Sequence, residues 1–303
     1  MLLGLTLAVG ASGCGGAGEP SGAPTAPAPA VTVTPGPDAT RSHPPEPATP
    51  SPAPSPSASA APAPTTPPSP TPTTPPTTPG PPPPPPPSAC TAPAALRGVD
   101  WERIPTTSKV VALTFDGGSS DAGVASILAT LRVEGVPATF FVTGDFARRY
   151  PAQVAAMSAA GHRMGNHSDH HDHYPELTNA EIAADLAAAE AAITATGARA
   201  ACPLFRFPFG DRTTADVAAV NDAGYVPVRW TVDSLGWTGT SRMTVQAVVD
   251  RVLDAATPGA IVLLHVGAHP DDGTTFDADA LPAIIAGFRA RGYSFVTLDR
   301  LLG

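Results

Sequence analysis

From Lys109 onward, short apolar runs alternate with longer Ala-rich stretches. The short runs are rich in β-branched and aromatic residues, which is typical of buried strands. They cover residues 110–115, 138–142, 204–207, 225–232, 260–265 and 293–298, with a weaker run before His167. The Ala-rich stretches predict helices at residues 123–134, 151–160, 179–196, 214–223, 244–256 and 280–291. Repeated strand–helix units predict an α/β fold in which helices surround a parallel, closed or nearly closed barrel.

Composition divides the chain into a low-complexity part and a globular part. Most of the 40 Pro residues lie in residues 15–89, which consist largely of Pro, Ala, Thr, Ser and Gly. Such a segment has little apolar surface to offset its ordering entropy, so we expect a disordered linker with a reach on the order of 200 Å. Residues 90–303 are then long enough for one α/β domain.

The first fourteen residues predict an export signal. Residues 2–13 are apolar and too short to span a bilayer as a helix. They are followed by Cys14, as in a bacterial lipobox, although Ala11 occupies the position where Leu is usual. No Lys or Arg precedes the run, which would fit a start upstream of Met1. Two outcomes stay open: a lipoprotein anchored to the membrane through Cys14, or plain secretion into the cell wall.

The cysteine count and the charge narrow the picture further. If Cys14 carries lipid, Cys90 and Cys202 remain and can form a disulfide in an oxidising compartment; two free buried thiols are the alternative.

The net charge of the chain is −9. The only Asp, Glu, Lys and Arg residues in residues 1–89 are Glu19, Asp38, Glu46 and Arg41, so most of this charge lies on the globular part. Binding to a phosphate backbone requires clustered Lys and Arg, which this acidic domain lacks, so we do not expect nucleic acid as a partner.

Ionisable residues follow five of the predicted strands. In a barrel of this class, chemistry collects at the carboxyl ends of the strands. Core packing does not explain an ionisable group at each of five ends, so we expect a site there. The groups, in chain order, are Asp116, the segment 167–171, Arg206, Asp233 with Trp237 nearby, and His265.

The segment 167–171 is a candidate metal site. His167 and His171 are four residues apart, so on a helical turn their imidazoles would share one face and grip one cation. Imidazole with carboxylate oxygen suits Zn²⁺, and other first-row divalent metals are compatible. A solvated polar turn is the alternative, since His170, His173, Asp169 and Asp172 surround the pair, but the ionisable groups at the other strand ends argue against it.

These residues resemble the ordered motifs of the polysaccharide deacetylase family, also known as the NodB homology or carbohydrate esterase 4 family. The motifs TFDDG, H-(S/T)-x-x-H, R-x-P-(Y/F), D-x-x-D-W and L-x-H are matched at residues 114–118, 167–171, 206–209, 233–237 and 263–265. The resemblance covers about residues 109–303. It implies a distorted (β/α) barrel with about seven parallel strands that hydrolyses N-acetyl, sometimes O-acetyl, groups of polysaccharides.

Two positions depart from the family's motifs. Gly117 replaces a metal-binding Asp, and Gly236 replaces the second Asp of the fourth motif. The metal would then be held by His167 and His171 with water, or with a carboxylate from elsewhere, for which Asp121 and Asp169 are candidates by their closeness in sequence. We expect weaker metal binding from the loss of a charged ligand, but a divergent enzyme rather than an inactive one.

The retained residues have roles in amide hydrolysis. Asp116 is the expected general base, held in place by Arg206, and His265 is the expected general acid, oriented or tuned by Asp233. Phe209 and Trp237 either stack on a sugar face or simply pack at the barrel mouth.

Deacetylation changes the charge of the polymer, which fits an enzyme tethered within a wall. Peptidoglycan is therefore the favoured substrate, ahead of chitin-like oligomers and acetylxylan. The competing hypotheses are a catalytically inert glycan-binding module that retains the barrel and, more weakly, a metal-scavenging envelope protein.

Overall fold

The computed structural model describes residues 90–303 of the chain. The predicted export signal, Cys14 and the Pro-rich linker lie outside the described residues. Between Cys90 and Gly303, no helix is both long and apolar enough to cross a membrane.

The centre of the domain is a curled parallel sheet. Seven strands follow one another in the order β5-β4-β3-β2-β1-β7-β6, and β8 pairs with the amino-terminal end of β1. Every pairing between these strands is parallel, so the predicted distorted α/β barrel is confirmed. The strands are β1 (Val110–Gly117), β2 (Thr139–Val142), β3 (Arg163–Asn166), β4 (Leu204–Phe205), β5 (Val226–Pro227), β6 (Val232–Asp233), β7 (Ala260–His265) and β8 (Ser294–Phe295).

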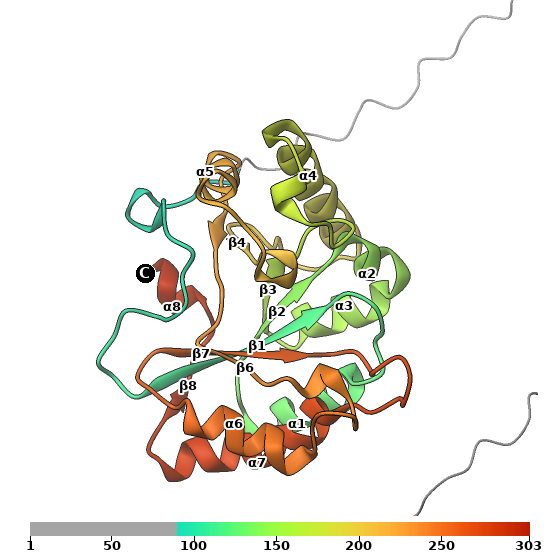
Figure 1. Cartoon of the computed structure of the whole chain (residues 1–303), viewed down its shortest axis with the longest axis vertical. Helices are drawn as coiled ribbons and strands as arrows, with labels where there is room; N and C mark the ends of the chain where they lie inside the picture. Colours follow the sequence, from blue (N-terminus) through green and yellow to red (C-terminus); the bar gives the residue numbers. More distant parts are fainter. Residues whose placement is uncertain (1–89) are drawn as a thin grey trace, which may run out of the picture. The chain divides into compact units, whose positions relative to one another are not determined.

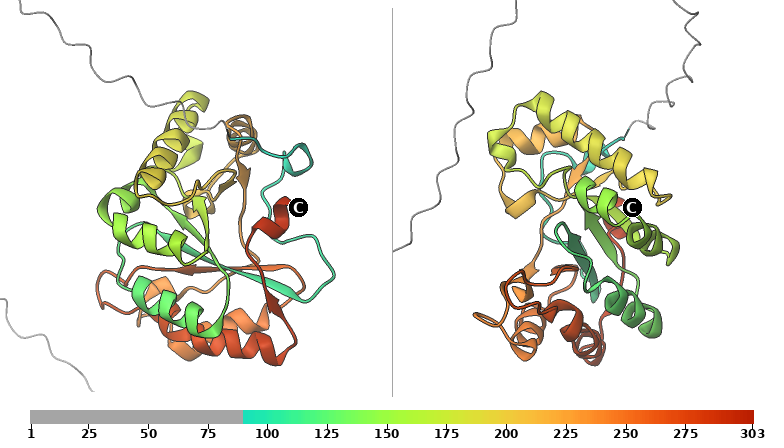
Figure 2. Two further views of the ribbon diagram at one scale, coloured as in Figure 1. Left: turned by 180° about the vertical axis from the view of Figure 1, so that it is seen from behind. Right: turned by 90° about the vertical axis from the view of Figure 1, so that its right-hand side faces the viewer.

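Helices cover the outside of the sheet in two groups. Figure 1 shows α1, α6 and α7 together on one side of the strands, with α4 and α5 on the opposite side, and the views in Figure 2 agree. The helices are α1 (Val124–Glu134), α2 (Gly144–Arg149), α3 (Pro151–Ala159), α4 (Asn179–Ala195), α5 (Thr214–Asp222), α6 (Val245–Asp254), α7 (Phe276–Ala290) and α8 (Asp299–Leu302).

Local sequence explains where several helices begin and end. Thr178 and Glu181 form a capping box at the start of α4, in which each side chain bonds the other residue's backbone N–H. Helix α1 ends at Gly135, whose φ of 61° lies in the left-handed region that Gly adopts without strain. The six predicted helices are found within about four residues of their expected bounds, whereas α2 and α8 were not predicted.

The run at residues 225–232 differs from the prediction of one strand. It forms two short strands, β5 and β6, which lie at opposite edges of the sheet, and residues 228–231 cross the opening between them. Trp101 makes an isolated backbone bridge to Val228, and Arg103 makes another to Ala260. Residues 225–228 and Val232 are buried, whereas Arg229, Trp230 and Thr231 between them are only half-buried. The apolar character of the run as a whole therefore does not reveal the break.

Alternation along β1 directs the candidate base into the barrel. Val111, Leu113 and Phe115 belong to the large core shared with the outer helices, whereas Ala112 belongs to the cluster inside the barrel. Because side chains alternate between the two faces of a strand, Asp116 lies on the same face as Ala112, at the carboxyl end of β1. The fold therefore carries Asp116 to the inner rim.

The predicted disulfide is present. Cys90 and Cys202 are joined across a sequence separation of 112 residues. The bond fixes the first described residue of the domain to the segment that immediately precedes β4.

Candidate active site

Asp116 and His265 are direct neighbours at the rim of the barrel. Their strands β1 and β7 pair in parallel, with Asp116 opposite His265 in the register. Each is a polar residue at the carboxyl-terminal end of a mostly apolar, buried strand, so burial of the strands determines their position. The expected base and acid are thereby brought to one site.

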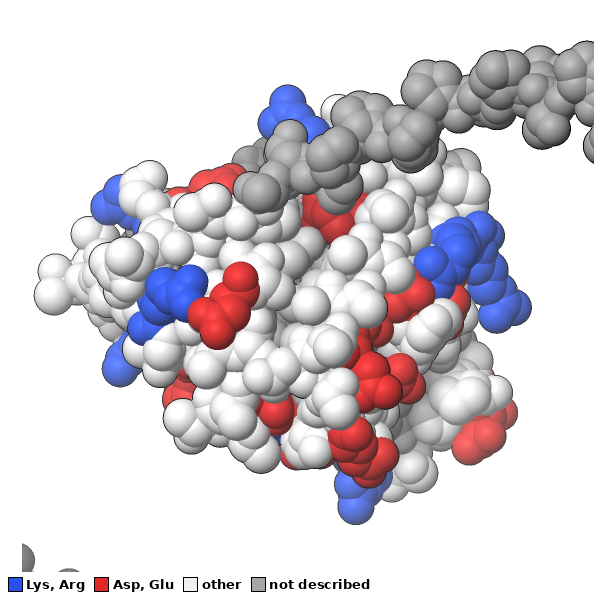
Figure 3. Space-filling view, turned by 90° about the horizontal axis from the view of Figure 1, so that it is seen from above, with Lys and Arg blue, Asp and Glu red and all other residues white. Residues whose placement is uncertain are grey.

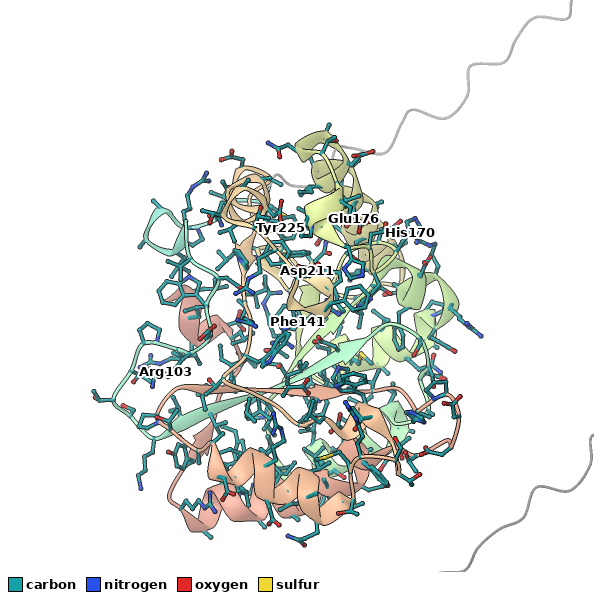
Figure 4. The ribbon with its side chains drawn as sticks, viewed as in Figure 1. Arg103, Phe141, His170, Glu176, Asp211 and Tyr225 are labelled. Atoms are coloured by element: carbon teal, nitrogen blue, oxygen red, sulfur yellow. A yellow bond between two sulfur atoms is a disulfide. The ribbon has the colours of Figure 1, made fainter. Side chains whose placement is uncertain are left out.

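Arg206 anchors Asp116 from below. Its side chain is fully buried, and Nη1 donates to Asp116 Oδ1 at 2.6 Å. The other two nitrogens of the guanidinium, Nε and Nη2, donate to Thr114 Oγ1 and to the carbonyls of Val228 and Arg229 at 2.9–3.1 Å. The guanidinium also lies 4.2 Å from the ring centre of Phe141, which Figure 4 labels in the middle of the barrel. A buried cation is tolerated here because its donors are satisfied.

The charge on Asp116 is maintained by its neighbours. Burial favours the neutral acid, but the positive charge of Arg206, its hydrogen bond and the nearby His167 and His265 outweigh burial, so the pKa of Asp116 lies below its ordinary value. Oδ1 is held by Arg206, whereas Oδ2 lies 3.4 Å from His167 Nε2. Asp116 therefore presents an ionised oxygen to the pocket, as a general base requires.

His167 and His171 lie on a turn, so the prediction of a helical turn is wrong. Ser168 and His171 both have left-handed backbones, with φ of 72° and 65°. The Oγ of Ser168 accepts the backbone N–H of His171, and Asn166 Oδ1 accepts that of Ser168. These local side-chain bonds replace helical ones and still bring the two imidazole rings within 4.9 Å of each other.

Both imidazoles are neutral and can each offer a nitrogen lone pair to a metal. Burial lowers the pKa of His167. Burial also lowers the pKa of His171 to about 4, with a smaller contribution from the nearby His167, because a positive charge on both rings at once is unfavourable. His167 Nδ1 bonds the carbonyl of Arg206 at 2.9 Å, which leaves Nε2 with its lone pair facing the pocket. Two neutral imidazoles beside a carboxylate fit a divalent metal of the zinc type.

The third protein ligand is not supplied by either expected carboxylate. Asp121 accepts from Gln153 at 2.7 Å, and Asp169 is engaged by Arg148 at 2.8 Å and by His170 at 3.1 Å. Neither lines the pocket, and no cluster of three His, Cys, Asp or Glu side chains with metal-binding geometry occurs in residues 90–303. The structure therefore supports only His167 and His171 as protein ligands.

Gly117 sits in apolar surroundings. A Cβ placed there would lie 3.2 Å from Val266, 3.3 Å from Val142 and 3.5 Å from Phe146. A side chain at this position would require Val266 and Val142 to shift by a few tenths of an ångström, whereas the contact with Phe146 is an ordinary one.

His265 is held by a residue that the sequence motifs did not indicate. Its Nδ1 lies 3.3 Å from Asp277 Oδ2, the same oxygen that accepts its backbone N–H at 2.8 Å. Asp233, the expected partner, instead bonds the indole N–H of Trp237 at 3.3 Å and the backbone N–H of Leu235 at 2.9 Å. Burial lowers the pKa of His265, but the hydrogen bond and charge of Asp277, with smaller contributions from Asp116 and Asp233, raise it above its ordinary value.

The pocket above these residues has a volume of about 510 Å³. Phe209 and Trp237 both line it and are among the most exposed large apolar side chains of residues 90–303, at 58% and 50%. Phe209 has a left-handed backbone, with φ of 59°, and its ring packs between His171 and His173. Exposed rings beside ionisable side chains fit contact with a sugar, which is one of the two roles considered for both residues.

A loop after β7 forms one wall of the pocket through Gly267, Ala268 and Pro270. Asp272 fastens this loop, because its Oδ2 accepts both the backbone N–H and the hydroxyl of Thr240 at 2.7–2.8 Å.

Charge in the pocket comes from Asp and His side chains. Asp116, Asp145 and Asp233 line it, but no Lys or Arg of the described domain does. On the face shown in Figure 3, Lys and Arg lie in small separate groups.

Comparison with known proteins identifies the family of this chain. Residues 103–228 match the family described as polysaccharide deacetylase. A chitooligosaccharide deacetylase of Rhizobium leguminosarum bv. trifolii is 36% identical over 221 residues, covering 68% of this chain and 98% of the relative. The chain thus belongs to the polysaccharide deacetylase family, a class of hydrolases.

Two similar solved structures are described as an esterase and as a pseudoenzyme. PdaA of Bacillus subtilis, a family 4 carbohydrate esterase, superposes with a TM-score of 0.61 at 29% identity, covering 67% of this chain and 85% of PdaA. BA3943 of Bacillus anthracis, described as a pseudoenzyme of the same family, superposes with a TM-score of 0.60 at 27% identity, covering 67% of this chain and 68% of BA3943.

Proposed function

We propose that this chain removes acetyl groups from N-acetylated sugars of a cell-wall polysaccharide, with peptidoglycan as the favoured substrate. The observation that carries the proposal is the convergence of an ionised Asp116, a neutral His167–His171 pair and His265 on one pocket. Amide hydrolysis needs a base, an electrophile and an acid within reach of one carbonyl carbon, and this pocket provides residues for each.

Asp116 begins the reaction. Its carboxylate, oriented by Arg206, takes a proton from water as the water oxygen attacks the acetyl carbonyl carbon. A divalent metal held by His167 and His171 would supply the Lewis acidity that polarises this carbonyl.

His265 completes the reaction. Asp277 occupies the Nδ1 side of the ring, so Nε2 is the nitrogen left for the substrate. The protonated imidazole gives its proton to the sugar nitrogen as the C–N bond breaks, which releases acetate and a free amine. The raised pKa of His265 keeps more of it protonated near neutral pH, as an acid of this kind requires.

The choice of peptidoglycan rests on the chain's amino-terminal third and on relatives. We propose that the chain is exported, and that it is either anchored by lipid on Cys14 or secreted, with residues 15–89 as a spacer. Curated relatives include a peptidoglycan-N-acetylglucosamine deacetylase of Bacillus cereus, 30% identical over 198 residues. Chitin-like oligomers are the second choice, because chitooligosaccharide deacetylases are also among the relatives.

An inert glycan-binding module is the competing function. Gly117 in place of a carboxylate and the resemblance to a pseudoenzyme favour it. The retained buried pair Arg206–Asp116 argues for activity, since burying these two charges is costly and their geometry suits a base.

Acetate release decides between the two. The full chain is incubated with purified peptidoglycan and with N-acetylglucosamine oligomers, with and without a chelator. We expect release that falls by roughly 10²–10⁴-fold in Asp116→Asn and in His265→Ala. Glycan binding without acetate release, whichever divalent metal is added, would establish the inert module.

A further inference from the structure

Asp277 is a buried carboxylate outside all five motifs. It lies in the first turn of α7 and is 3% exposed. Its Oδ2 bonds His265 twice, whereas Oδ1 has no hydrogen-bond partner among the residues described. A buried carboxylate with one unpaired oxygen costs free energy, so its persistence needs an explanation beyond stability.

The unpaired oxygen lies against Gly236. A Cβ on Gly236 would be 2.2 Å from Asp277 Oδ1 and 2.7 Å from its carboxyl carbon. Both distances are shorter than any van der Waals contact, so Asp277 occupies the space that a side chain at position 236 would fill. Position 236 is also where the fourth motif would have its second Asp.

We propose that Asp277 is the positioning residue of His265 and that Gly236 is the residue that makes room for it. The inference rests on the proposed function and adds to it the residue that fixes the acid. The carboxylate of Asp277 reaches His265 from α7. A carboxylate at position 236 would reach the same space from the turn after β6. Two bonds from one oxygen, to the backbone N–H and to Nδ1 of His265, hold the ring relative to its own strand.

Asp277 lies at the amino-terminal end of α7. It is the second residue of a 15-residue helix, where the helix dipole favours negative charge. By accepting the Nδ1–H of His265, Asp277 holds the neutral ring in its Nδ1-protonated tautomer, so Nε2 is the nitrogen that gains and loses the proton of the reaction.

The test combines kinetics with a spectroscopic readout on the full chain. Nitrogen NMR of ¹⁵N-histidine-labelled protein reports whether Nδ1 or Nε2 of His265 is protonated, with the signal assigned through His265→Gln. In Asp277→Asn and Asp277→Ala we expect loss of the Nδ1-protonated form and a kcat lower by roughly 10- to 100-fold, with KM little changed. Asp279→Ala is the matched control, because Asp279 lies exposed in the same helical turn.

Relocating the carboxylate provides the second arm. Gly236→Asp alone should lower kcat, since it collides with Asp277, whereas Gly236→Asp combined with Asp277→Gly should restore kcat above that of either single variant. An unchanged His265 spectrum in both Asp277 variants, or a double variant whose kcat is no higher than that of the better single variant, would overturn the proposal. If the wild-type chain releases no acetate but its His265 tautomer still depends on Asp277, the positioning role stands and the proposed function fails.

Discussion

The guanidinium of Arg206 and the carboxylate of Asp116 form a buried ion pair across 90 residues of sequence, with Nη1 and Oδ1 2.6 Å apart. This pair connects the end of β4 to the end of β1 through the interior of the barrel. It both stabilises the charge on Asp116 and leaves one carboxylate oxygen free for the pocket.

Removing Arg206 should destabilise the fold. Arg206→Met leaves an unpaired buried carboxylate, so we expect the free energy of unfolding to fall by about 3–5 kcal/mol in urea titrations. The matched control is Arg289→Met, because Arg289 pairs with Glu134 at the surface and should contribute no more than about 1 kcal/mol. Equal effects of the two substitutions would contradict the importance given to the buried pair.

The His pair should carry metal binding. Calorimetric titration of Zn²⁺ into metal-free protein is expected to show one site. His171→Gln should lower the affinity for Zn²⁺ by more than roughly 10- to 100-fold, which is the cost of losing only a hydrogen-bond partner of a metal ligand. His173→Gln is the control, since that residue bonds Asp211 and does not line the pocket. Undiminished affinity in His171→Gln would place the metal elsewhere.

Stability of the metal-free protein should depend on pH through His171. The unfolded chain binds this proton with a pKa near 6.5 and the folded chain with a pKa of about 4, so the unfolded state binds more protons between these values. We therefore expect the free energy of unfolding to fall as the pH drops from about 6.5 to about 4. His265 has the opposite sign, because its raised pKa stabilises the fold at low pH and that contribution is lost as the pH rises.

Comparison with His171→Gln isolates this contribution. Urea unfolding at pH 4.5 and 7.5, with chelator present, should show a smaller loss of stability for the variant than for the wild type. Identical losses would mean that His171 is not the residue that titrates.

The exposed aromatic residues should affect substrate binding more than chemistry. Trp237→Ala and Phe209→Ala are each expected to raise KM by roughly 2- to 10-fold on N-acetylglucosamine oligomers, with kcat little changed. Val133→Ala is the control, as Val133 is exposed on α1 and does not line the pocket. A change confined to kcat would instead indicate that these rings support the catalytic groups.

Loss of the disulfide should lower stability without affecting the site. Cys90→Ser and Cys202→Ser together open a loop of 112 residues, and we expect a loss of about 2–4 kcal/mol in the free energy of unfolding. Acetate release at 25 °C should remain, and a reducing agent should destabilise only the wild type.

The sequence by itself determined the barrel and most of the rim. Runs of buried strands alternating with helices require parallel pairing, and the carboxyl ends of parallel strands lie at one edge, so Asp116, Arg206 and His265 could be assigned to one site from their places after the strands. The same reasoning gave the His pair, although it gave the wrong local conformation for it.

Only the tertiary structure decided which side chains meet. The break at residues 228–231 depends on how far the sheet curls, and the partner of His265 depends on where α7 docks. Asp277 lies outside the five motifs, and a single sequence does not show that it fills the space beside Gly236. Contacts of this kind are set by packing between elements far apart in the chain, whereas periodicity reports only which face of each element is buried.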